Sequence, residues 1–354
     1  MSEVPARARP DACPGVFATH DAADGALARV RLPGGRVTSA QLRVLADCAE
    51  ELGDGSAHLT SRGNVQLRGL SRDTGELVAR LSAAGLLPAP SHERVRNFLA
   101  SPLSGLAGGL VDVRPLVASL DAAVCARPEL AALPGRFLFA LDDGRGDVAA
   151  EDADVCWQAT EDGGVLLLAG QVVGPEADPV PALVREALRF LEIRGDAWRM
   201  RELPRFAGAP RQPARPVRVG EFARDDGGRG LCIAPLFGEL PSSALRLLAE
   251  SPEVVVTPWR TVVVPEFRTE LSALSTDSQV SACIGRPGCA KSLADVRADA
   301  RKVSARAHFS GCARRCGKPR DAADVVAENG GYRVEGDWVP ADRVAESLVQ
   351  KGKA

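Results

Sequence analysis

The sequence has 354 residues, more than one hydrophobic core usually serves, so we expect two domains or two repeated units. Hydrophobic residues make up 45% and charged residues 25%, which is typical of globular proteins and excludes extended disorder. The net charge of -2 gives no overall positive field for nucleic acid or an anionic membrane. No stretch is apolar enough to span a membrane and the first residues lack a signal peptide's apolar core, so we expect a cytoplasmic protein.

The first 85 residues show the pattern of one unit that combines strands and helices. The pattern predicts a strand, a tight turn, a helix, a second strand and a shorter helix, in that order, at residues 26–32, 33–35, 38–52, 58–70 and 73–85. Thr38 and Ser39 are candidate caps of the first helix, because a hydroxyl there can accept a backbone N–H of the first turn. Residues 1–12 are polar and rich in proline and arginine, which predicts a flexible arm.

A later stretch repeats this unit. LRVLA at 42–46 aligns without a gap with LRLLA at 245–249, and VVVTPWRTVVV at 254–264 resembles the predicted second strand. The repeat length is about 200 residues, which suggests duplication of a half-molecule around a pseudo-twofold axis. Between the halves, residues 203–219 carry four prolines and no apolar periodicity, as expected of an extended linker.

Four of the nine cysteines form two spaced pairs, Cys283-x5-Cys289 and Cys312-x3-Cys316, with 22 residues between the pairs. Thiolates are ligands for zinc and for iron–sulfur centres. The x5 spacing is wide for a zinc knuckle, and glycines beside each pair let backbone N–H groups approach bound sulfur, so we favour a [4Fe–4S] cluster over zinc. The remaining cysteines are scattered singly and are expected to be small packing residues: Cys13, Cys48, Cys125, Cys156 and Cys232.

These cysteines, together with ARVRLPGGRVTSAQLRVLA, LTSRGNVQLRG and VRNFLASPLSG, resemble the signatures of the sulfite and nitrite reductase superfamily. The resemblance covers most of residues 13–330. It implies that all four paired cysteines hold a [4Fe–4S] cluster and that Cys316 also bridges to a sirohaem iron. A sirohaem or a second, mononuclear iron is therefore a possible further cofactor.

The basic residues are unevenly distributed, since five lysines stand against 39 arginines and no lysine precedes Lys291. A bound tetrapyrrole carries many carboxylates, and guanidinium groups bind carboxylates through two parallel hydrogen bonds. The family resemblance places Arg29, Arg62 and Arg96 in the pocket. Alternation along the strands adds further candidate cofactor-binding residues: Arg31, Gln66 and Arg68 with Asn64 on the same face of the Arg62 strand.

Within the superfamily, the length, the CPG near the start, APLFGELPSSALRLLA and VTPWRTVVVP are most similar to the precorrin-3B synthases. This branch implies hydroxylation of precorrin-3A with O2 and an external electron donor, either ferredoxin or an NAD(P)H-linked reductase. Reductases of the family carry a K-x-K pair over the bound anion, where this chain has Arg136 and Leu138. The alternatives are a sirohaem-dependent sulfite or nitrite reductase and a non-catalytic iron–sulfur or zinc protein that keeps the fold as a binding module.

The implied fold is α+β, with duplicated ferredoxin-like half-domains and cluster-binding lobes around a pseudo-twofold axis. The expected boundaries follow the chain: the arm at 1–12, the first half-domain at 13–86, the first reductase-like lobe at 87–202, the linker at 203–219, the second half-domain at 220–270 and the [4Fe–4S] lobe at 271–354. We expect neither nucleic acid nor a membrane as a partner.

Overall fold

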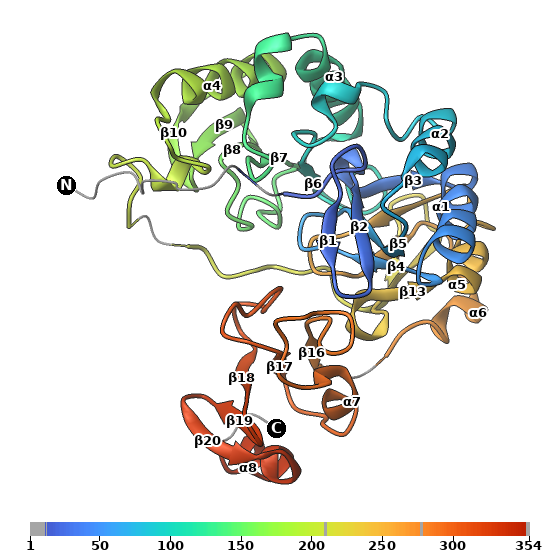
Figure 1. Cartoon of the computed structure of the whole chain (residues 1–354). Helices are drawn as coiled ribbons and strands as arrows, with labels where there is room; N and C mark the ends of the chain where they lie inside the picture. Colours follow the sequence, from blue (N-terminus) through green and yellow to red (C-terminus); the bar gives the residue numbers. More distant parts are fainter. Residues whose placement is uncertain (1–10, 12, 209–210, 277–278, 352–354) are drawn as a thin grey trace.

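The computed structural model describes residues 11, 13–208, 211–276 and 279–351. Residues 1–10 and 12 of the predicted arm lie outside this part. The described chain forms four five-stranded sheets. In the view of Figure 1, the sheet of strands β6 to β10 lies at the upper left and the sheet of strands β16 to β20 lies at the bottom, below the region around β1, β2 and β5. In the described part of the chain, no helix has both the length and the apolar character needed to cross a bilayer.

The first sheet is antiparallel throughout and is covered by two helices. Its strands, in spatial order, are β1 (His20–Ala22), β2 (Gly25–Val30), β5 (Val65–Leu70), β4 (Ser56–Leu59) and β13 (Glu239–Pro241), and its helices are α1 (Ser39–Leu52) and α2 (Gly75–Ala83). Thr38 caps α1 as predicted, because its side chain accepts the N–H of Gln41 while the Gln41 side chain accepts the N–H of Thr38.

The single strand predicted over residues 58–70 is wrong. This stretch forms two strands, β4 and β5, joined by a tight turn in which Gly63 has a φ of 62°. Thr60 closes the turn by accepting backbone N–H groups of Arg62 and Asn64 through its hydroxyl. Arg62 and Asn64 therefore lie in a turn and do not continue the face of β5 that carries Gln66 and Arg68.

The second sheet repeats the first. Its strands, in spatial order, are β11 (Gly220–Ala223), β12 (Arg229–Ile233), β15 (Val262–Val264), β14 (Glu253–Val256) and β3 (Arg36–Thr38), and its helices are α5 (Ser242–Leu248) and α6 (Thr269–Ser272). The order of elements after β12 matches the order after β2, which confirms the sequence repeat.

The two repeats exchange one strand each. β3 leaves the first repeat and pairs with β14, with Val37 opposite Val254, while β13 leaves the second repeat and pairs with β4, with Leu240 opposite Ala57. Both repeats also contribute to one continuous apolar core. The first and second sheets are therefore interlocked and bury their apolar faces together.

The third sheet combines a parallel and an antiparallel part. Its strands, in spatial order, are β10 (Gln171–Pro175), β9 (Gly163–Leu168), β8 (Val155–Thr160), β7 (Phe139–Asp142) and β6 (Phe98–Ala100), and its helices are α3 (Arg114–Cys125) and α4 (Pro179–Ile193). Strands β6, β7 and β8 are parallel, whereas β9 and β10 are antiparallel additions. Leu203 and Phe206, which fall in the predicted linker, are buried in the core of this unit.

The fourth sheet has the same topology as the third. Its strands are β16 (Ser281–Ala282), β17 (Ala307–Ser310), β18 (Ala323–Glu328), β19 (Gly331–Val334) and β20 (Asp337–Pro340), and its helices are α7 (Val296–Ala300) and α8 (Val344–Gln350). Again three parallel strands are followed by two antiparallel ones. Short 3-10 turns complete the described elements at Pro33–Gly35, Pro90–His92, Pro128–Ala132, Met200–Glu202, Leu236–Gly238 and Ala341–Arg343.

Candidate functional site

The cysteine loops follow two neighbouring parallel strands of the fourth sheet. Cys283 comes directly after β16 and Cys312 comes shortly after β17, so both loops leave the same edge of the sheet. The backbone N–H of Cys283 donates to the carbonyl of Phe309 at 3.0 Å, and the N–H of Gly311 donates to the Sγ of Cys283 at 3.1 Å. The register of β16 on β17 thereby fixes Cys283 against the second cysteine loop.

Backbone hydrogen bonds also hold the loop of Cys289 in place. The N–H of Cys289 donates to the carbonyl of Gly285 at 2.8 Å, and the N–H of Leu293 donates to the carbonyl of Gly311 at 2.9 Å. A Cβ on Gly311 would lie 2.0 Å from the Oγ of Ser292, so only glycine permits this approach of the two loops. The two cysteine pairs are therefore brought together by the chain itself.

The spacing of the four thiols separates the two metal hypotheses. Burial raises the pKa of Cys316, and Cys283, Cys312 and Cys289 raise it further, so the other three sulfur atoms lie near enough to act on Cys316. In a tetrahedral zinc site the sulfur atoms lie about 3.8 Å apart, given Zn–S bonds of about 2.3 Å. Among the described residues, no three cysteine sulfur atoms lie within 4.8 Å of one another. The one group of three possible metal ligands that are this close is Asp142, Asp143 and Asp147. The wider cysteine set suits a four-iron cluster.

The guanidinium groups of Arg29 and Arg62 both lie close to Cys13 and Gly135, beside the third sheet. From β2, Arg29 donates to the Oε1 of Gln66 at 2.7 Å and to the Sγ of Cys13 at 3.3 Å. From the β4–β5 turn, Arg62 donates to the carbonyl of Gly135 at 3.2 Å, which also accepts the thiol of Cys13 at 3.3 Å. Burial lowers the pKa of Arg62 to about 10, so its guanidinium remains charged at neutral pH.

Arg31 and Arg96 are bound by the protein itself. Arg31 is 2% exposed and donates to the backbone carbonyls of Pro14 at 2.7 Å and Arg94 at 3.2 Å. Arg96 forms a two-pronged ion pair with Asp121, at 2.7 and 2.6 Å. Both arginines line a cavity of about 590 Å³ against α3, whose lining includes neither Arg29, Arg62 nor a cysteine. The structure thus separates Arg96 from the Arg29–Arg62 pair with which the family resemblance groups it.

Arg68 connects the first sheet to the cysteine loops. Its guanidinium pairs with Asp24 at 3.0 and 2.9 Å and donates to the carbonyl of Gly288, the residue before Cys289, at 3.0 Å. Gln66, its neighbour on the same face of β5, accepts a hydrogen bond from Arg29. The side chains of Gln66 and Arg68 therefore connect Arg29 and Arg62 to the first cysteine loop along one face of β2 and β5.

Arg136 and Leu138, at the positions of the family's paired lysines, have different surroundings. The exposed guanidinium of Arg136 lies over the ring of Trp198, 5.0 Å from its centroid. Leu138 is buried in a small apolar cluster with Leu99 and Val148. No ammonium group stands at either position.

The third and fourth sheets match residue by residue at the point where the cysteines begin. Ser101 follows β6 and donates its backbone N–H to the carbonyl of Leu141 on β7 at 3.2 Å. Cys283 follows β16 and donates its backbone N–H to the carbonyl of Phe309 on β17 at 3.0 Å. Ser101 therefore occupies, in the first half, the place that Cys283 occupies in the second.

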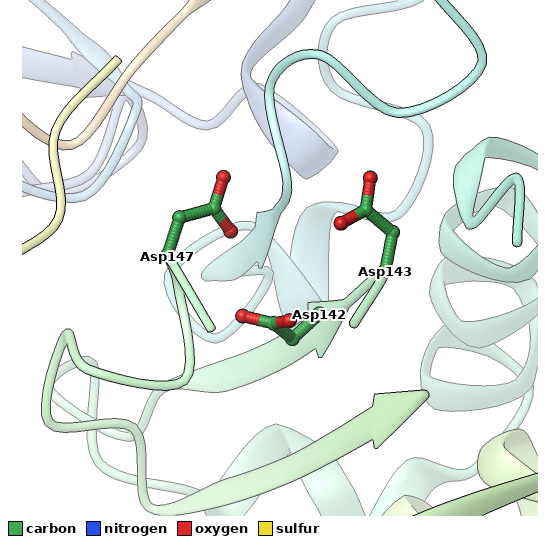
Figure 2. A group of neighbouring side chains, drawn as sticks. All are labelled: Asp142, Asp143 and Asp147. Atoms are coloured by element: carbon green, nitrogen blue, oxygen red, sulfur yellow. The ribbon is translucent and has the colours of Figure 1, made fainter. Parts of the chain in front are cut away.

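Figure 2 shows what the first half carries at this place. Asp142 is the last residue of β7, and Asp143 and Asp147 follow in the loop that corresponds to the loop of Cys312; all three are buried. The Oγ of Ser101 accepts the N–H of Asp143 at 3.1 Å and donates to the Oδ1 of Asp147 at 2.6 Å. The remaining oxygens of Asp142 and Asp143 are largely satisfied by backbone N–H groups and by Arg145. The first half thus carries a hydrogen-bonded carboxylate network where the second half carries cysteines.

The sequence reasoning missed this network and also missed Arg260, which lies beside the cysteines. The comparison of TSRGN with TPWRT contained the signal for Arg260, because Thr60 aligns with Thr257 and Val65 with Val262. This alignment places Arg260 opposite Gly63. The three aspartates were harder to predict, because nothing in the sequence shows that they lie next to Ser101, the counterpart of Cys283.

Comparison with known proteins agrees with this architecture. Residues 20–84 match the model of the nitrite/sulfite reductase ferredoxin-like half domain. A precorrin-3B synthase from a Sinorhizobium species is 26% identical over 92% of this chain and 82% of its own length. The structure of the NirA protein of Mycobacterium tuberculosis superimposes over 91% of this chain and 79% of that chain, with a TM-score of 0.71 and 20% identity. These comparisons support the nitrite and sulfite reductase superfamily, near precorrin-3B synthase.

Other members of the superfamily align over a smaller part. Ferredoxin–nitrite reductases from Synechococcus elongatus and Leptolyngbya laminosa are 38% and 37% identical over 40% and 36% of this chain. These alignments cover only 29% and 27% of the two reductases. The enzymes to which the chain is similar are oxidoreductases, and the α+β fold with a ferredoxin-like half-domain is shared with this superfamily.

Proposed function

We propose that this protein is an oxygenase of the precorrin-3B synthase type, which hydroxylates precorrin-3A with O2 and reductant. One observation carries this choice over a nitrite reductase: the alignment with the precorrin-3B synthase spans 82% of that enzyme, whereas those with the two nitrite reductases span less than a third of each. The buried Leu138, at a position where an anion reductase carries a lysine, supports the same choice.

The four cysteines would hold a [4Fe–4S] cluster, because their spacing fits separate corners of a cubane and the Gly311 N–H already points at a ligand sulfur. When bound, the cluster supplies electrons one at a time. Cys316 is the exposed member of the four, and it is the residue that would face a further iron, sirohaem or substrate.

Arg29 and Arg62 would bind and orient the macrocycle. Both guanidinium groups are half-buried, one extending from β2 and the other from the β4–β5 turn. Among the described residues, no carboxylate lies within 4.0 Å of either group. Substrate carboxylates can provide the missing negative charge through two-pronged hydrogen bonds. Holding a large flat substrate in one register selects one carbon for reaction.

The overall reaction consumes one O2, two electrons and two protons, places one oxygen atom on the tetrapyrrole and releases the other as water. The electrons come from an external donor. The nitrite reductase relatives are named for ferredoxin, which supports a ferredoxin here, and an NAD(P)H-linked reductase is the alternative donor.

A sirohaem-dependent nitrite or sulfite reductase is the second candidate, supported by the 38% identity to a nitrite reductase over 149 residues. Anaerobically purified protein with a reduced electron donor distinguishes the candidates. We expect O2-dependent conversion of precorrin-3A and no sustained consumption of nitrite or sulfite. Protein that lacks iron and acid-labile sulfide would refute both candidates and leave a binding module.

A further inference from the structure

The tips of the two hairpins β4–β5 and β14–β15 have the same backbone but different side chains. In both turns the N–H of the fourth residue donates to the carbonyl of the first: Gly63 to Thr60 at 3.3 Å and Arg260 to Thr257 at 3.1 Å. The φ angles agree as well, at 62° for Gly63 and 60° for Arg260. This left-handed conformation suits glycine and strains an arginine, so a side chain is kept here against a local cost.

Two glycines make room for the Arg260 side chain. A Cβ on Gly238 would lie 3.0 Å from both the Cβ and the Cδ of Arg260. A Cβ on Gly317 would lie 1.9 Å from the terminal nitrogen NH2 of Arg260. The guanidinium therefore rests against the backbone of the residue that directly follows Cys316.

The charge of Arg260 has no carboxylate partner within 4.0 Å among the residues that the structure describes. The charged groups that act on it are Arg297, which repels it, and the sulfur atoms of Cys283 and Cys316, which attract it when they are thiolates. Arg297 itself pairs with Glu239. A half-buried cation without a carboxylate partner is stabilised by negative charge nearby, and the cysteine sulfur atoms are the groups that can supply it here.

We propose that Arg260 is the cationic partner of the cysteine-held cluster and raises its reduction potential. The inference rests on the proposed cluster and adds a positioning residue outside the four ligands. Reduction adds negative charge to a cluster, and a nearby fixed cation stabilises the reduced form more than the oxidised form. Because Gly63 has the same turn conformation, glycine at position 260 should be compatible with the hairpin.

The test is a redox titration of the cluster, followed by electron paramagnetic resonance, in the full-length protein and in Arg260→Gly and Arg260→Lys. We expect Arg260→Gly to keep its iron and sulfide, to unfold at an equal or higher temperature because the strained φ is relieved, and to have a more negative midpoint potential. Arg260→Lys should restore the potential at least in part. Arg229→Gln, which removes an exposed arginine paired with Glu221, is the control for net charge and should leave the potential unchanged.

An unchanged potential in an Arg260→Gly protein with an intact cluster would overturn the inference. Loss of the cluster in both Arg260 variants would also overturn it, because the residue would then be structural. If Arg260→Gly loses the cluster while Arg260→Lys keeps it, the need for a positive charge is supported. Absence of iron and sulfide from the unmodified protein would instead refute the proposed function, which separates the two failures.

Discussion

The backbone N–H of Gly311 donates a hydrogen bond to the Sγ of Cys283 at 3.1 Å. Such a bond favours the thiolate over the thiol and helps to hold a ligand sulfur in one orientation. The first half reproduces this bond with oxygen in place of sulfur, from the N–H of Asp143 to the Oγ of Ser101 at the same distance. Duplication has thus kept the backbone and changed the chemistry of the two loops.

Replacing a cluster ligand should remove the iron. We expect Cys289→Ser and Cys312→Ser to lose iron and sulfide and to unfold at a temperature lower by at least about 5 °C, because the cluster joins two separate loops. Iron analysis and calorimetry measure both effects. Cys125→Ser on α3 is the control and should retain its iron. One zinc per chain and no labile sulfide in the unmodified protein would refute the cluster assignment.

The arginines should divide into two classes. Arg29→Ala and Arg62→Ala are expected to weaken tetrapyrrole binding by about tenfold to a hundredfold, with little loss of stability, since each removes a charge-assisted contact to the guest. Equilibrium binding followed by absorbance measures the change, with the exposed Arg72→Ala as the control. Unchanged affinity in both variants would show that the guest lies elsewhere.

Arg96→Ala should act mainly on stability. Its removal leaves Asp121 without its two-pronged partner, so we expect the free energy of unfolding to fall by about 1–3 kcal/mol. Denaturant unfolding monitored by circular dichroism measures this. If the variant stays as stable as the unmodified protein but binds tetrapyrrole as weakly as Arg29→Ala, then Arg96 exchanges its ion pair with Asp121 for one with a substrate carboxylate.

The carboxylate network predicts a pH dependence. Burial raises the pKa of Asp147 from 3.8 to about 7, although the hydrogen bond from Ser101 opposes this shift. The folded protein therefore binds a proton that the unfolded chain releases, so this contribution to stability is complete below about pH 4 and is lost as the pH rises through about 7. Asp147→Asn should flatten the melting temperature between pH 5 and pH 8. An identical pH profile in the variant would show that Asp147 is already ionised when folded.

The strand exchange predicts that neither half folds alone. A fragment of residues 1–208 lacks β13 and a fragment of residues 211–354 lacks β3, so each would expose an unpaired sheet edge and part of the shared core. We expect each fragment to be insoluble or unfolded when expressed alone and the two to form a soluble complex when co-expressed. Cooperative unfolding of either isolated fragment would contradict the interlocked core.

The sequence was most informative where the signal is local. The cap of α1, for which Thr38 and Ser39 were the candidates, and the turn before it were recognisable because such signals lie within a few residues. The duplication was visible from a short repeated string. In contrast, the stretch around Arg62 was predicted as one strand, since apolar alternation continues through a tight turn whose geometry depends on Thr60 and Gly63.

Long-range partners explain the rest. Arg96 lies in a segment that resembles the family motif, but its partner Asp121 lies 25 residues later on α3. This ion pair could not be predicted from the periodicity of the sequence. The role inferred for Arg260 depends on Gly238 and Gly317, which approach it from other elements. Packing of this kind is a property of the assembled fold and has no counterpart in the spacing of residues along the chain.

Product analysis distinguishes an oxygenase from an anion reductase. The anaerobically purified protein is mixed with a reduced electron donor and given, in separate reactions, precorrin-3A with isotopically labelled O2, nitrite or sulfite. We expect a tetrapyrrole product that carries one labelled oxygen atom and no sustained consumption of either anion. Rapid six-electron reduction of nitrite or sulfite, with precorrin-3A left unchanged, would show that the protein is an anion reductase instead.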